Sequence, residues 1–164
     1  MPVFAITPEP LSVDALAAEV ARAASDTVEG CGAVTTFAGL VRAQHKGRRV
    51  LHLEYEAYEP LALKVFAQIQ QEAAEAWPGV ALGMHHRVGR LEIGDTSIVI
   101  VAASAHRAPS FEVCRYAIER VKQIAPIWKH EYFEDGAAWV EGAVADPLDG
   151  AARQRARARA CTSA

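Results

Sequence analysis

Hydrophobic and polar positions along the chain follow two periods, and these periods predict its strands and helices. Alternation predicts strands over residues 3–6, 32–41, 50–58, 80–88, 91–93, 97–104, 127–133 and 138–140. An apolar residue every three or four positions predicts helices that run from Ser12 to about Ala24, from Pro60 to Ala76 and from Pro109 to Gln123. Hairpins are mixed with helical crossovers in this order, which predicts an α+β fold: a mixed sheet with helices packed on it.

Two of these strands are expected to pair directly. The turn residues 44–47 (Gln-His-Lys-Gly) lie between strands 32–41 and 50–58, so the two strands should form a hairpin. In the second strand, alternation separates a mainly apolar face, Leu51, Leu53, Tyr55 and Ala57, from a polar face, His52, Glu54, Glu56 and Tyr58.

The length of 164 residues fits one domain, which we expect to span residues 1–141. From Gly142 onward the sequence is rich in Ala, Asp, Pro, Gly and Arg. Residues 142–164 are therefore expected to form a mobile tail. Its alternating arginines are expected to be exposed to solvent.

The charge balance excludes some partners. The net charge is −3, and the tail carries Arg153, Arg155, Arg157 and Arg159; without them 13 basic residues stand against 20 acidic ones. An acidic body argues against nucleic-acid binding. Apolar runs end well before the roughly 18 residues that a membrane helix needs, and no basic stretch followed by an apolar one opens the chain. We therefore expect a cytoplasmic protein without a membrane anchor.

The cysteines suggest neither disulfides nor a metal site. Cys31, Cys114 and Cys161 are odd in number and form no C-x-x-C pair. His85 and His86 are adjacent on a predicted strand and so point to opposite faces, which argues against their joint use as metal ligands. The expectation is three reduced thiols, no bound metal and no cofactor.

The start of the third helix combines a basic pair with free backbone donors. His106 and Arg107 precede Pro109, and Ala108 is a poor cap for the N–H groups of the first turn. Such a helix end can bind a phosphate or carboxylate. A surface loop with a salt bridge is an equally good reading of this segment.

Two lysines follow. Lys122 lies at the edge of the apolar stripe of the third helix, where a lysine commonly extends its amino group to solvent. Lys129 follows Trp128; a lysine beside a buried tryptophan can lose its proton more readily, as a nucleophile or base requires. An ordinary ion pair between Lys129 and Glu131, which share a strand face, is the alternative.

Strand 32–41 ends in Arg42, and its Gly39 allows close backbone approach. Glu54 and Glu56 resemble a general acid and base pair on one strand face. Two carboxylates at this spacing are more often solvated charges or partners of arginine.

Taken together, five pieces in this order resemble the large, catalytic subunit of molybdopterin synthase. They are Phe37-x-Gly39-x-Val41-Arg42, Leu53-x-Tyr55-Glu56-Ala57-Tyr58, His86-Arg87-x-Gly89, Ser104-x-His106-Arg107, and Lys122-x-x-x-Pro126-x-Trp128-Lys129-x-Glu131 followed by Trp139-Val140. The resemblance covers residues 30–141 and implies a fold of the α/β hammerhead type.

The resemblance implies a sulfurtransferase of molybdenum cofactor biosynthesis. Its substrate would be cyclic pyranopterin monophosphate, which gains a dithiolene and becomes molybdopterin. The sulfur would arrive as a thiocarboxylate at the C-terminus of a small ubiquitin-like subunit. Two large subunits would form a homodimer with a small subunit at each end, which makes a heterotetramer.

The resemblance also assigns roles to residues. Lys122 and Lys129 would be catalytic, and Arg42, His106 and Arg107 would bind the substrate phosphate. The implied substrate-binding set is Leu40, Val41, Arg42, His106, Arg107, Lys122, Lys129, His130 and Glu131. The five cationic side chains are expected to converge on one pocket.

One departure concerns the dimer, because the basic residue that the family commonly presents after Trp139-Val140 is missing here until Arg153. Two other functions fit parts of the sequence: a non-catalytic anion-binding or protein-docking module that uses the same basic pocket, and a hydrolase built on Glu54 and Glu56.

Overall fold

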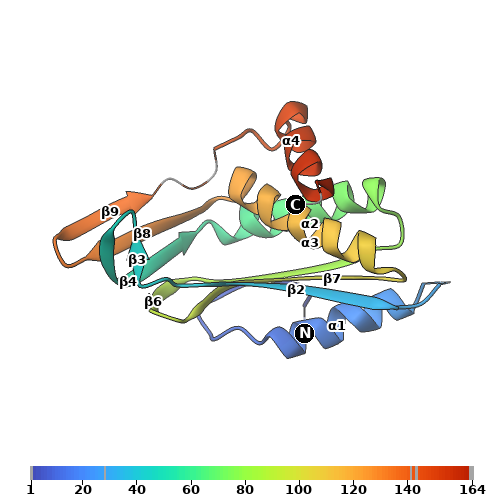
Figure 1. The fold of residues 1–164 in the computed structure, drawn as a ribbon, viewed down its shortest axis with the longest axis horizontal. Coiled ribbons are helices and arrows are strands. Elements are labelled where there is room, and N and C mark those ends of the chain that lie inside the picture. The colour runs from blue at the N-terminus through green and yellow to red at the C-terminus, as the bar shows by residue number, and fades with distance from the viewer. Residues whose placement is uncertain (1, 28, 141, 143, 163–164) are drawn as a thin grey trace.

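The computed structural model describes residues 2–27, 29–140, 142 and 144–162. Figure 1 shows the elements, which follow in the order β1 (Phe4–Thr7), α1 (Val13–Ser25), β2 (Ala33–Leu40), β3 (Gln44–His45), β4 (Arg48–Ala57), α2 (Glu59–Ala76), β5 (Ala81–Arg87), β6 (Gly89–Glu92), β7 (Thr96–Ser104), α3 (Arg107–Ile124), β8 (Ile127–Phe133), β9 (Gly136–Val140) and α4 (Gly150–Cys161).

The first sheet is a layer between helices. Its strands lie in the order β1-β5-β7-β2, with β1 parallel to β5 and the other pairs antiparallel. Helix α1 covers one face, and α2 and α3 cover the other (Figure 1). The sequence prediction of an α+β fold with a mixed sheet and helices packed on it is confirmed.

Strand β7 is central because its sequence is apolar on both faces. Ile98, Ile100 and Ala102 face α2 and α3, whereas Val99, Val101 and Ala103 face α1. A strand buried on both faces reads as a continuous apolar run, which is the pattern of residues 98–103. On the neighbouring strand, a Cβ at Gly83 would lie 2.5 Å from a methyl carbon of Val20, so glycine allows α1 to pack closely.

The second sheet has the order β3-β4-β8-β9, and β6 also pairs with β4. The predicted hairpin between strands 32–41 and 50–58 is wrong, since β2 pairs with β7 of the first sheet and β4 pairs with β6 and β8. The turn residues join β4 to the two-residue strand β3 instead. Lys46 and Gly47 both have positive φ, of 49° and 77°, as a tight hairpin turn requires.

Helix α4 differs from the mobile tail expected over residues 142–164. Asp149 caps it by accepting a hydrogen bond from the backbone N–H of Ala151 at 2.8 Å. Ala152, Ala156 and Ala160 are buried, and α4 packs on α3. Alanines four residues apart share one helix face, and this pattern was concealed by the arginines between them. Glu141, where the predicted domain ends, lies outside the described residues.

A buried ionic cluster holds the segment before α4. The Glu72 carboxylate accepts hydrogen bonds from Arg120 at 2.8 Å and from the Tyr116 hydroxyl at 2.6 Å. Burial raises the pKa of Glu72, but these hydrogen bonds outweigh it and leave the pKa below its ordinary value. Arg120 also donates to the carbonyl of Pro147, so the cluster ties α2 and α3 to the chain that leads into α4.

In the described ranges, no helix has the length and apolar character needed to cross a membrane.

Candidate active site

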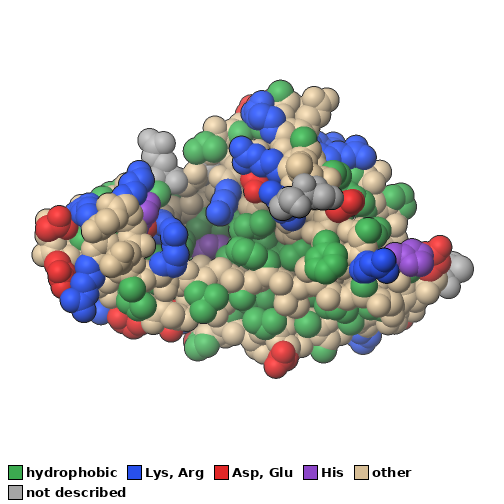
Figure 2. Space-filling view, viewed as in Figure 1, with side chains coloured by type: hydrophobic (Ala, Val, Ile, Leu, Met, Phe, Trp, Pro, Cys, Tyr) green, Lys and Arg blue, Asp and Glu red, His purple; other side chains and the backbone are tan. Residues whose placement is uncertain are grey.

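A pocket of about 430 Å³ lies where the two sheets meet the C-terminal half of α3. Figure 2 shows the hollow, with basic side chains at its edge and hydrophobic surface inside. Apolar residues form most of the wall: Phe37 and Leu40 from β2, Ile98 from β7, Ile118 and Val121 from α3, and Ile127 from β8. Val140, Gly142 and Val144 complete it. The pocket is thus lined by both sheets and by α3.

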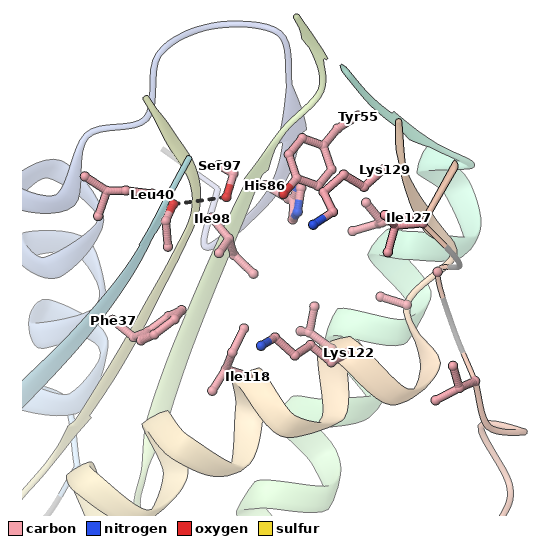
Figure 3. A pocket seen from close by; sticks show the side chains of 16 residues that line it. Phe37, Leu40, Tyr55, His86, Ser97, Ile98, Ile118, Lys122, Ile127 and Lys129 are labelled. Carbon is pink, nitrogen blue, oxygen red and sulfur yellow. Dashed lines mark hydrogen bonds between the residues drawn. The ribbon is translucent and has the colours of Figure 1, made fainter. Parts of the chain in front are cut away.

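Two lysines face into this pocket from consecutive elements. Lys122 lies in the last turn of α3 and Lys129 lies on β8, and Figure 3 shows both amino groups directed into the cavity. The helix ends at Ile124 before Pro126, which lacks the N–H that would continue it. The turn of the chain at this point brings both lysines to one cavity, as the resemblance implies.

The Lys129 amino group is held by a buried carboxylate. Its nitrogen lies 2.5 Å from Oε1 of Glu131, and Nδ1 of His45 lies 2.5 Å from Oε2. Glu131 is only 2% exposed. Burial raises the pKa of Glu131, but hydrogen bonds from Lys129 and His45 outweigh it, so the pKa lies below its ordinary value. The ion pair that the sequence left as an alternative is present.

Trp128 does not bury Lys129. Successive residues of a strand point to opposite faces, so Trp128 lies on the outer face of β8, where it is 41% exposed. The proposed influence of a buried tryptophan on Lys129 is therefore wrong.

Three polar residues that the expected substrate-binding set does not include also line the pocket: Ser97, Tyr55 and His86. Ser97 donates a hydrogen bond to the carbonyl of Gly39 at 3.0 Å (Figure 3). Tyr55 lies with its ring edge-on to that of His86, the centroids 5.0 Å apart. Burial raises the pKa of Tyr55, opposed by the neighbouring Ser97 hydroxyl. For Tyr55 the signal was position, because it pairs with Lys129 across β4 and β8.

The segment after β2 contributes less than expected. Leu40 lines the pocket, but Val41 is buried in the small core of the second sheet, and Arg42 is exposed. His130 points away from Lys129 and stacks on Trp139 at 4.4 Å between ring centroids. Of the expected substrate-binding residues, only Leu40, Lys122 and Lys129 are among the described residues that line this pocket, and Glu131 supports Lys129 from beneath.

His106 and Arg107 lie at the opposite end of α3. Lys122 follows His106 by 16 positions, which corresponds to about 24 Å along a helix at 1.5 Å per residue. His106 lines another hollow, with Ser104 and Pro109. The expected convergence of five cationic side chains is therefore wrong within a single chain. His106 and Arg107 lie at the start of α3 and Lys122 lies near its end, so the length of the helix keeps them apart.

Neither the carboxylate pair nor the cysteines belong to the pocket. Glu54 and Glu56 lie on the face of β4 opposite Tyr55, and Glu54 accepts a hydrogen bond from Tyr132 at 2.9 Å. The three cysteines are free thiols, and burial raises the pKa of Cys114 to about 12. No cysteine is among the described lining residues, and the described part of the chain holds no cluster of three His, Cys, Asp or Glu that could bind a metal.

Comparison with known proteins matches residues 6–124 to the family described as MoaE protein. A relative named molybdopterin synthase catalytic subunit, from Halalkalibacterium halodurans, is 47% identical over 137 residues, 84% of this chain and 84% of the relative. The crystal structure of molybdopterin synthase from Staphylococcus aureus matches with a TM-score of 0.78 and 40% identity, over 86% of this chain and 98% of that one.

A third match is a protein–protein complex of subunits 1 and 2 of the molybdopterin-converting factor from Helicobacter pylori. Its TM-score is 0.68 at 26% identity, and it covers 85% of this chain and 91% of that one. The family match spans well over half of the sequence and runs from the second half of β1 to the end of α3. Relatives named molybdopterin synthase catalytic subunit are similar to this chain over most of its length, and the chain therefore belongs to the MoaE family.

Proposed function

We propose that this protein is the catalytic subunit of a molybdopterin synthase, a sulfurtransferase that converts cyclic pyranopterin monophosphate into molybdopterin by forming its dithiolene. The observation that carries the proposal is that Lys122 and Lys129, 7 positions apart in sequence, direct their amino groups into one largely apolar pocket. Cations in a pocket with little water attract an anionic substrate strongly.

The sulfur donor in this proposal is the C-terminal thiocarboxylate of a small ubiquitin-like subunit. The Helicobacter pylori relative is a complex of two subunits, and the apolar wall of Phe37, Leu40 and Ile118 suits an extended peptide tail. The described lining residues include no cysteine that could carry the sulfur, so a donor from outside the chain fits this cavity.

The two lysines have different surroundings, which suggests different tasks. Lys129 is fixed by Glu131, so its amino group stays at one place on the wall, where it can position the substrate and pass a proton. Lys122 has no ion-pair partner among the described residues. Its amino group is thus available to the thiocarboxylate or to the anionic substrate.

A reconstituted reaction tests the function. The protein is mixed with thiocarboxylated small subunit and cyclic pyranopterin monophosphate, and dithiolene formation is followed. We expect Lys122→Ala and Lys129→Ala to lower turnover by about 100-fold or more, as the loss of a positioned acid or base does. Lys64→Ala, on the exposed face of α2, is the matched control and should leave turnover unchanged.

Unchanged turnover in both pocket variants would contradict the proposed roles. If Lys122→Ala instead weakens ligand binding while wild-type protein makes no dithiolene, the protein is a non-catalytic anion-binding module.

We further propose a homodimer, which becomes the core of a heterotetramer with one small subunit at each end. Strand β2 is an edge of the first sheet, and Val34 and Leu40 on it are 43% and 56% exposed. Phe111 of the adjacent helix α3 is 61% exposed. An apolar sheet edge needs a cover. A second copy would supply it and would bring His106 and Arg107 to a pocket that they do not reach within their own chain.

The proposed compartment is the cytoplasm. The three cysteines are all free, the state that a reducing compartment maintains.

A further inference from the structure

One histidine of the pocket has no part in the reaction as proposed above. His86 lies on β5 and lines the cavity next to Tyr55, in the same part of the pocket as Lys129 (Figure 3). It is 5% exposed, and Figure 2 shows histidine surface deep in the hollow. Its neighbour His85 points to the other face of the strand, where Nε2 lies 2.8 Å from the carbonyl oxygen of Pro2.

The hydrogen bond that His86 makes fixes its tautomer. Nδ1 lies 2.8 Å from the carbonyl oxygen of Arg87. A carbonyl oxygen only accepts hydrogen bonds, so Nδ1 carries a proton. Burial lowers the pKa of His86 to about 4, although the bond to Arg87 opposes this shift. The ring is therefore neutral near pH 7, and Nε2 carries a lone pair and no proton.

That lone pair lacks a partner within the described part of the protein. The only hydrogen bond that His86 makes to those residues is through Nδ1, while the ring itself borders the cavity. No side-chain polar atom of the described residues is both fully buried and unpaired, so Nε2 is open to the cavity, where water or a ligand can donate a hydrogen bond to it. The structure thus offers an acceptor of fixed direction inside the pocket.

The other polar side chains of the pocket differ from His86 in what they offer. Lys122 and Lys129 only donate hydrogen bonds, and the hydroxyl groups of Ser97 and Tyr55 can both donate and accept, whereas Nε2 of the neutral His86 ring only accepts. Phosphate and thiocarboxylate groups are acceptors, so they match the lysines and not His86. The nitrogen heterocycle of a pterin carries N–H groups, which are donors and match Nε2.

We propose that Nε2 of His86 accepts a hydrogen bond from an N–H group of the substrate's nitrogen heterocycle, and so determines which way round the substrate lies between the two lysines. This inference rests on the proposed function. His86 is then a substrate-binding residue that distinguishes a donor-bearing heterocycle from other anions of similar size.

The test compares two replacements of His86 in the reconstituted enzyme. His86→Phe keeps a ring but removes the acceptor, and it should raise KM for cyclic pyranopterin monophosphate roughly tenfold, with kcat changed less than about threefold. His86→Gln places an amide oxygen near the position of Nε2 and should keep KM within about threefold of wild type. His85→Phe makes the same change on the opposite face and should leave KM unaltered.

Each outcome decides the matter. If wild-type protein turns over but His86→Phe keeps a normal KM, the inference is wrong and the proposed function stands. If kcat falls while KM stays, His86 acts on the chemical step and the inference is also wrong. If wild-type protein forms no dithiolene, the proposed function itself fails.

A measurement on unaltered protein covers the case in which His86→Phe does not fold. In nitrogen-15 NMR spectra, Nε2 of His86 should resonate as an unprotonated ring nitrogen and should move upfield when the substrate is added. Inorganic phosphate, which carries the anionic charge without the heterocycle, should not produce this shift. An unchanged Nε2 resonance with substrate bound would overturn the inference.

Discussion

Glu131 shows which contacts of a single residue local sequence can predict. It follows Lys129 by two positions on β8, so alternation alone indicates that the two side chains share a face and form an ion pair. Its second partner, His45, comes from a strand 86 positions away. No local pattern encodes that distance, because it depends on how β3 and β4 are placed beside β8.

We expect Glu131→Gln to lower the free energy of unfolding by about 2 kcal/mol at pH 7, because the Lys129 and His45 groups lose their counter-charge. The pKa of Glu131 is lowered in the folded protein, so the contribution of the carboxylate is fully present above its ordinary pKa of 4.5 and is lost as the pH falls through the lowered value. The stability difference between wild type and variant, measured by urea unfolding, should therefore shrink below about pH 4.5. A difference that stays constant down to about pH 3 would contradict this assignment.

His86 was visible in the sequence as part of His86-Arg87-x-Gly89, yet adjacent histidines were judged only as metal ligands. The two side chains point to opposite faces of β5, as predicted: His86 lines the pocket, and His85 contacts the carbonyl of Pro2 on the other face. What could not be predicted is the burial that makes His86 neutral, because it depends on Tyr55 from the second sheet.

At the scale of elements, periodicity predicted the existence of most strands and helices but not their partners. Ser12 caps α1 as expected, its hydroxyl oxygen accepting from Ala15 at 3.2 Å. In β4 a register shift between Val50 and His52 turns Leu51 outward, where it is 44% exposed, although alternation placed it on the apolar face. A bulge moves one residue across the sheet and leaves no mark in composition.

Helix α4 provides a test at this scale. Ala156 is fully buried against α3, whereas Ala158 is exposed two positions later. Ala156→Glu places a charge without a partner in the interface, and we expect it to detach α4 and to lower the free energy of unfolding by about 3 kcal/mol. Ala158→Glu adds the same charge on the solvent face and should change stability by less than about 0.5 kcal/mol. Equal unfolding midpoints for the two variants in urea would show that α4 does not pack on α3 in solution.

At the scale of the whole molecule, the pocket depends on how the two sheets are joined. The resemblance assigns Lys122 and Lys129 to one site, and the two lysines, which are close along the chain, line the same pocket. His106 and Arg107 were grouped with them by chemistry, and the length of α3 keeps them apart. The charge of a side chain can be read from the sequence, but the distance between side chains at the two ends of a helix requires the structure.

The proposed dimer predicts complementation between two inactive variants. Lys122→Ala removes a lysine from the pocket of its own chain, and Arg107→Ala removes a cation that acts in the partner's pocket. After mixing under conditions that exchange subunits, half of the dimers should be mixed, and each of these holds one intact site of two. Turnover should recover to about a quarter of the wild-type value, measured as dithiolene formation. Mixtures that stay as inactive as the separate variants would show that both residues serve the same chain.

The residues that line the pocket are spread widely along the sequence, and this determines the stage of synthesis at which the pocket can form. Its lining runs from Phe37 to Val144 and draws on both sheets and on α3. During synthesis on a ribosome, a chain lacking β8 and β9 would have the first sheet and its helices but only part of the wall. Domains generally fold as units once their long-range contacts can form. The binding cavity thus comes into existence only after β8 and β9 have been synthesised, so a shorter nascent chain cannot yet bind a ligand there.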